Sequence, residues 1–100
     1  MSSSAEQVEP PRAVRVSTSD DELTVQFHDG RTISVPLRWY PRLEHASSEE
    51  RQNWKLIGNG TGVHWPAIDE DISVQALLQG LPSGESLASL QRWRTGRRSS

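Results

Sequence analysis

Apolar residues occupy every second position in two neighbouring stretches between residues 22 and 37. This alternation is typical of β-strands with one buried face. The apolar face of the first stretch is formed by Leu23, Val25 and Phe27, and that of the second by Ile33, Val35 and Leu37. The pattern predicts an antiparallel hairpin whose two strands bury the same face.

The length of the connecting loop decides the register of this hairpin. A two-residue loop, Asp29-Gly30, would place the two apolar sets on opposite faces, because a slip of one residue inverts every side chain. A three-residue loop over residues 28–30 pairs Val25 with Ile33 and keeps both sets on one face. We therefore predict the three-residue loop, with Gly30 in the left-handed conformation of a bulge.

Two further segments predict strands. Residues 13–18 alternate, with Val14 and Val16 on one face, which indicates a strand ahead of the first hairpin. A second hairpin is predicted from strands near 56–57 and 63–65, separated by the glycine-rich turn "GNGTG".

Two short helices are expected between the hairpins. Pro41 suits a first helical turn, where its missing N–H costs nothing, and Leu43 and Ala46 would then face inward. The stretch Ser47 to Glu50 has the pattern of a capping box, which predicts a second short helix over about 48–53.

The clearest helical pattern follows the second hairpin. Ser73 is suited to be the N-cap, Gly80 can end the helix, and one face is lined by Val74, Leu77 and Leu78. The acids of residues 69–71 precede this helix, so we interpret them as compensating the positive end of its dipole.

These elements predict an α+β fold. A small antiparallel sheet of about five strands, built from two hairpins, is packed with short helices and followed by a C-terminal appendage. Residues 1–12, rich in Ser, Glu and Pro, are predicted to be a disordered tail, and residues 13–80 the compact domain. Residues 81–100 are predicted to form a C-terminal arm, weakly helical near 85–94, with a basic end.

Composition narrows the class of protein. The 100 residues contain no cysteine, which excludes disulfides and thiolate zinc sites. No apolar run approaches the roughly 20 residues of a membrane helix, and the N-terminus has no segment that resembles a signal peptide. We therefore expect a cytoplasmic protein that does not contact a membrane. Residues 1–91 hold thirteen acidic and seven basic residues, a formal charge of −6, so the body is acidic and its tail basic.

No pattern of reactive residues predicts catalysis, and no cofactor is expected. The three histidines, His28, His45 and His64, lack metal-ligand spacing, so no metal site is predicted. The "GNGTG" turn joins two predicted strands and is not followed by a lysine, unlike a phosphate-binding loop.

The tryptophans divide between core and surface. Trp54 and Trp65 lie where predicted helices meet strands, and we expect them to be buried or half-buried. Trp39, Tyr40 and Arg42 belong to a loop that enters a helix, and these residue types are over-represented at binding hot spots. Together with the apolar residues of the arm, they form the predicted partner-binding set: Trp39, Tyr40, Arg42, Leu87, Leu90 and Trp93.

Several motifs in combination resemble a small bacterial family, the domain of unknown function 2442. They are "F-x-D-G" at 27–30, "VPL-x-W-Y-P-R-L" at 35–43, the segment 51–54, and "HWP-x-x-D-E-D-I-S" at 64–73. The resemblance covers about residues 13–80. It implies a compact α+β fold, no known catalytic activity, and pairing with another small protein encoded nearby as a toxin–antitoxin module. Some members carry a helix-turn-helix domain after this one, but the roughly twenty residues after Gly80 are too few for it.

Three functions follow as hypotheses. The first is a non-enzymatic protein-binding module, the antitoxin-like half of a toxin–antitoxin pair, whose arm folds onto a small protein encoded nearby. The second is a nucleic-acid accessory protein that uses Arg92, Arg94, Arg97 and Arg98, although the acidic body disfavours nucleic acid. The third is a small-ligand binder. A second copy of the chain is a further candidate partner, through an edge strand or the C-terminal arm.

Overall fold

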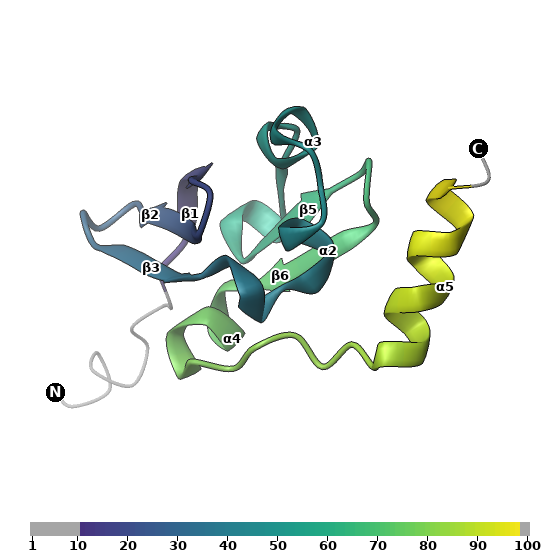
Figure 1. The fold of residues 1–100 in the computed structure, drawn as a ribbon. Helices are drawn as coiled ribbons and strands as arrows, with labels where there is room; N and C mark the ends of the chain where they lie inside the picture. Colours follow the sequence, from purple (N-terminus) through teal and green to yellow (C-terminus); the bar gives the residue numbers. More distant parts are fainter. Residues whose placement is uncertain (1–10, 99–100) are drawn as a thin grey trace, which may run out of the picture.

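The computed structural model describes residues 11–98 and shows an α+β fold with two small antiparallel sheets and short helices (Figure 1). The strands are β1 (Ala13–Thr18), β2 (Glu22–Phe27), β3 (Thr32–Pro36), β4 (Lys55–Ile57), β5 (Gly62–Trp65) and β6 (Glu70–Ser73). The 3-10 helices are η1 (Leu37–Trp39) and η2 (Gly58–Gly60), and the α-helices are α2 (Pro41–Glu44), α3 (Ser48–Gln52), α4 (Val74–Gln79) and α5 (Leu87–Arg98). The α+β class and both hairpins are confirmed, but within residues 11–98 the strands number six and form two sheets.

The first hairpin has the predicted register. Val25 of β2 lies opposite Ile33 of β3. At the turn, the amide of Phe27 donates to the carbonyl oxygen of Arg31 at 2.9 Å, and Gly30 adopts a φ of 93°. The three-residue loop is therefore confirmed, because it alone buries the apolar faces of both strands together.

β1 completes this sheet but contains an irregularity. Its register with β2 shifts between Ala13 and Arg15. A bulge adds one residue to a strand and so changes which side chains face the core beyond it. Ala13 and Val16 are buried, whereas Val14 is 51% exposed. The predicted shared face of Val14 and Val16 is wrong for this reason.

The second sheet contains a strand that was not predicted. Residues 70–73 pair with β5, with Glu70 opposite Trp65 and Ile72 opposite Val63. The acids before α4 therefore belong to a turn and a strand, and none lies in the first turn of the helix, so the interpretation that they compensate its dipole is wrong. Ser73 alone caps it, because its hydroxyl oxygen accepts a hydrogen bond from the amide of Ala76 at 3.0 Å.

α4 is shorter than the predicted pattern suggests. It buries Val74 and Leu77, while Leu78 is exposed, which corrects its predicted place on the inner face. Gly80 ends the helix with a φ of 72°, as predicted. The helix has only six residues, so its buried stripe extends over little more than one turn.

Short helices join the two sheets around the core. Pro41 opens α2, and Leu43 and Ala46 are buried as predicted. The capping box at Ser47 and Glu50 is present. Trp65 is fully buried in the predicted core role, and its indole N–H donates to the carbonyl oxygen of Arg51 in α3 at 3.0 Å, while Trp54 is half-buried.

The two ends of the chain differ from the prediction. Residues 1–10 of the predicted tail lie outside the described residues, but Pro11 is buried and the backbone carbonyl of Arg12 accepts a hydrogen bond from the amide of His28 at 2.9 Å. These contacts order the last two residues of the predicted tail. At the other end, residues 81–86 have no regular structure and lead to α5, which stands at one side of the molecule (Figure 1). No helix in residues 11–98 is both long and apolar enough to cross a membrane.

Candidate functional site

The predicted partner-binding residues contact one another. The guanidinium of Arg42 binds the Glu85 carboxylate at 3.0 Å (Nε to Oε1) and 2.7 Å (Nη2 to Oε2). A further nitrogen, Nη1, donates to the carbonyl oxygen of Ile68 at 3.1 Å. The same guanidinium lies 5.4 Å from the centroid of the Trp93 ring. Two regions predicted to bind a partner thus form an intramolecular contact between α2 and the arm.

This contact limits what the predicted residues can present to a partner. Tyr40 is buried, and its hydroxyl donates to the carbonyl oxygen of Leu81 at 3.4 Å, so its predicted exposure is wrong. Trp39 is half-buried, and Leu90 is buried against the body. Leu87 is 77% exposed. The beginning of the arm covers Tyr40. Residue types that are frequent at binding hot spots do not show whether another part of the same chain already buries them.

The described arginines of the arm line two different depressions. Arg97 binds Glu50 at 2.8 Å and lies 4.6 Å from the Trp93 ring centroid, and with Arg94 it lines a depression of about 300 Å³. Arg92 lines a different surface, and the side chain of Arg98 lies outside the described residues. This division weakens the nucleic-acid hypothesis, which needs the arginines together along one strand of phosphates.

The histidines have separate partners. His64 forms a side-chain contact with Asp71 across β5 and β6, and His28 accepts the backbone N–H of Arg12 on its Nδ1 at 3.0 Å. Within residues 11–98, no three His, Cys, Asp or Glu side chains gather as a metal-binding group.

A buried acidic residue lies beneath the arm. Burial, and then the nearby Glu85, Asp71 and Asp69 carboxylates, raise the pKa of Glu70 to about 7 against the opposing effect of Arg42. Burial and the nearby Glu70 raise the pKa of Tyr40 to about 12.

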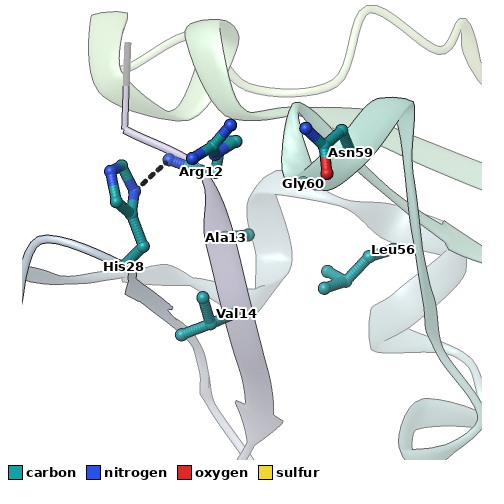
Figure 2. A pocket seen from close by; sticks show the side chains of 7 residues that line it. All are labelled: Arg12, Ala13, Val14, His28, Leu56, Asn59 and Gly60. Carbon is teal, nitrogen blue, oxygen red and sulfur yellow. Dashed lines mark hydrogen bonds between the residues drawn. The ribbon is translucent and has the colours of Figure 1, made fainter. Parts of the chain in front are cut away.

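A groove lies where the start of β1 meets the β4–β5 hairpin. Its volume is about 590 Å³, and Figure 2 shows the residues that line it, namely Arg12, Ala13, Val14, His28, Leu56, Asn59 and Gly60. β1 and β4 each end their sheet, so within residues 11–98 each has one edge without a strand partner. Unpaired edges of this kind are recurrent sites at which proteins bind extended segments.

Gly60 fixes the floor of the groove. A side chain at this position would meet the carbonyl oxygen of Ala13 at 2.8 Å and the Cβ of Arg12 at 2.9 Å, and its φ of +89° also requires glycine. The hairpin tip therefore lies directly on the backbone of β1. This close approach holds the two sheets together at one end of the groove.

Apolar side chains remain exposed beside this floor. Val14 is 51% exposed and Leu56 36%, and both line the groove, whereas Ile57, the next residue of β4, is 40% exposed but is not among the lining residues. Single exposed apolar residues are normal, but a group on two adjoining strand edges is typical of an interaction site. The β1 bulge is what turns Val14 outward, and the sequence gives no signal for it. The sequence contains the "GNGTG" turn and His28, but no pattern in it predicts that both line one groove.

Comparison with known proteins assigns the chain to a family. Residues 13–83 match the model of the family described as Protein of unknown function (DUF2442). The chain belongs to this family. A crystal structure of a protein of unknown function from Rhodospirillum rubrum ATCC 11170 is similar, with 28% identity and a TM-score of 0.67 over 79% of this chain and 98% of that chain. Comparison with curated proteins gave no match.

The boundary of the DUF2442 region separates the two surfaces. Six of the seven residues that line the groove lie within residues 13–83, and Arg12 directly precedes them. The helix α5 begins at Leu87, beyond the matched region. In this DUF2442 chain, the groove is therefore part of the family domain and α5 is an addition to it.

Proposed function

We propose that this DUF2442 chain is a non-enzymatic protein-binding module of the cytoplasm that receives its partner in the groove between β1 and β4. Its partner is a second small protein encoded beside it, and this chain is the neutralising half of a toxin–antitoxin pair. The resemblance to the family suggested such a pairing. The groove provides a surface that suits it.

One observation carries the proposal. Val14 and Leu56 are exposed in the groove, on two strands that each have one edge without a strand partner within residues 11–98. A protein segment that covered them would bury apolar area and could use the unpaired backbone groups of the edge. The residues predicted from composition serve this purpose less well, because Tyr40 and Leu90 are already buried within the chain.

The test is co-purification with the product of the neighbouring gene. A Leu56→Asp variant should lose the partner, because it places a carboxylate among the exposed apolar side chains of the groove. Leu87→Asp is a matched control: it makes the same change at an exposed leucine of α5, at 77% exposure, away from the groove. Both variants should keep the melting temperature of the unchanged chain.

Each outcome has a definite meaning. Loss of the partner with Leu56→Asp alone supports the groove. Loss with Leu87→Asp alone would move the site to the arm, and retention with both would reject the groove. Failure of the unchanged chain to retain the neighbouring gene product would reject the pairing itself.

A further inference from the structure

The junction between the family domain and α5 contains two covered carboxylates and one cation. Residues 81–86, the linker, run from α4 to α5 (Figure 1), and the Glu85 side chain among them is only 9% exposed. Glu70 of β6 is buried, also at 9% exposure. The Arg42 side chain of α2, 17% exposed, acts on both carboxylates. Two acids therefore share one guanidinium at a place where water screens their charges poorly.

Hydrogen bonds decide which of the two acids holds the guanidinium. Arg42 Nε donates to both carboxylate oxygens of Glu85, at 3.0 and 2.9 Å, and Nη2 donates to Oε2 at 2.7 Å. Nη1 donates to the backbone carbonyl oxygens of Ile68 and Asp69, each at 3.1 Å. Among the described residues, none of these donors binds Glu70, so Glu85 is the acid that Arg42 neutralises.

The other groups around Glu70 leave a charge on it uncompensated. The charged groups that act on it come from α2, the turn before β6, β6 itself and the linker, and they are Arg42, Asp69, Asp71 and Glu85. Tyr40, which also lies near Glu70, is uncharged at neutral pH, and His64 contacts the largely exposed side chain of Asp71. A proton on Glu70 therefore removes repulsion between carboxylates, in agreement with its pKa of about 7.

We propose that a proton on Glu70 controls the attachment of the arm: the linker docks while Glu70 is neutral and loosens when Glu70 ionises. An ionised Glu70 repels Glu85 and competes with it for Arg42, whose ion pair with Glu85 fixes the beginning of the arm. Release carries the Glu85 carboxylate away and admits water to Glu70, so the released form binds the proton more weakly than the docked form. By linkage, docking is favoured at acid pH and weakens as the pH rises through about 7.

The proton acts on one end of the arm. At the far end of α5, the Arg97–Glu50 pair stays charged, because hydrogen bonds from Arg97 hold the pKa of Glu50 below its usual value. Leu90, between the two ends, is held by apolar burial, which does not titrate. Loosening therefore begins at the linker and uncovers Tyr40, whose hydroxyl donates to a backbone carbonyl there. The groove is lined by other residues, so this inference does not rest on the proposed function.

Thiol reactivity measures the opening of the arm, because the chain contains no cysteine. Leu90→Cys places a thiol that reacts with dithiodipyridine when the arm opens. Leu87→Cys, in the same helix at 77% exposure, corrects for the chemistry of the thiol at each pH. The ratio of the two reaction rates should rise about fivefold to tenfold between about pH 5.5 and pH 8.5, which corresponds to a Glu70 pKa that falls by about one unit on release. An unchanged ratio would overturn the proposal.

Further variants assign the response. With Glu70→Gln, the ratio should become independent of pH, whereas Glu49→Gln, at an exposed glutamate of α3, should keep the full response. A response that survives Glu70→Gln would belong to another group, such as a histidine, and would overturn the proposal. Val25→Cys, in the core, reports unfolding of the whole chain. Equal opening at Leu90→Cys and Val25→Cys would show that the arm opens only with the entire domain, and would also overturn it.

A second measurement does not depend on the cysteine variants. The carbon-13 NMR signal of the Glu70 carboxyl group, followed with pH in the otherwise unchanged full chain, gives its pKa directly. Glu85→Gln removes the carboxylate that the arm brings to Glu70 and frees Arg42 to neutralise it, so the pKa of Glu70 should fall toward its ordinary value. The same pKa in both chains would show that the arm and the proton are not coupled.

Discussion

At the scale of single residues, Glu70 is the charged side chain that this fold buries among residues 11–98. It lies in β6 opposite Trp65, and the nearby Glu85 carboxylate adds to the effect of burial on its pKa, which rises to about 7. The proton is therefore held more tightly in the folded protein than in the unfolded chain. Its contribution to stability is fully present below about pH 4.5 and is lost as the pH rises through about 7.

Replacement of Glu70 by glutamine should remove this pH dependence. One unit of pKa shift corresponds to about 1.4 kcal/mol, and residual contact with solvent reduces the full value. We expect Glu70→Gln to be more stable than the unchanged chain by about 1–2 kcal/mol at pH 8 and about equally stable at pH 5. Urea unfolding at the two pH values measures the difference, with Glu49→Gln as a control at an exposed glutamate. An equal effect of Glu70→Gln at both pH values would contradict the assignment.

The sequence did not predict that Glu70 is buried, because it contains no sign of the strand that buries this side chain. Three acids in succession before an N-cap serine are typical of a helix start, and no apolar alternation marks residues 70–73 as a strand. The strand forms because pairing with β5 places Ile72 in the core, and Glu70, two residues earlier, shares that face. Trp65 could be predicted because a large ring between short elements has few alternatives to burial.

At the scale of elements, the predictions that succeeded depend on local chemistry. The register of β2 and β3 follows from their own apolar positions, and α3 begins where a capping box of Ser47 and Glu50 lies in the sequence. The elements that failed depend on distant contacts. The β1 bulge exposes Val14 at the groove, in the part of the strand that the β4–β5 hairpin approaches closely, and no local residue pattern predicts it.

The cap of α3 offers a direct measurement of this local chemistry. The Ser47 hydroxyl oxygen accepts a hydrogen bond from the amide of Glu50 at 3.1 Å, and the Glu50 carboxylate accepts one from the amide of Ser47 at 2.9 Å. Ser47→Ala should lower the free energy of unfolding by about 1 kcal/mol, because it leaves a helix donor without its partner. Ser48→Ala, at the next exposed serine, should change it by less than about 0.5 kcal/mol. Equal values from chemical denaturation would show that the cap does not hold the helix.

At the scale of the whole molecule, α5 is a helix added to a complete domain. The buried cluster that holds the sheets together is formed by residues 13–77, and Trp93 is half-buried against it. Two ion pairs, Arg42 with Glu85 and Arg97 with Glu50, hold the arm in place. The sequence could predict an amphipathic arm, but whether it folds onto this chain or onto a partner depends on these long-range pairs.

Removal of residues 84–100 should therefore leave a folded domain. The truncated chain keeps the matched family region and the groove but loses the buried Leu90, the Trp93 contact and both ion pairs. Burial of a leucine contributes about 1.5–3 kcal/mol, and ion pairs contribute about 0–1 kcal/mol each at the surface and more when partly buried, as these two are, so we expect a loss of about 3–5 kcal/mol. Urea unfolding should retain a single cooperative transition.

Substitutions at the two leucines of α5 distinguish the stability that comes from a buried side chain from the stability that comes from the presence of the helix. Leu90→Ala in the full chain should account for much of the lost stability, whereas Leu87→Ala, at an exposed position, should change it by less than about 0.5 kcal/mol.

Truncation also distinguishes the two candidate surfaces. Because the groove lies outside the deleted residues, the truncated chain should still retain the neighbouring gene product. The arm hypothesis expects the opposite, since deletion of the arm would then remove the binding residues. Loss of the partner from a truncated chain that remains folded would therefore reject the groove in favour of α5.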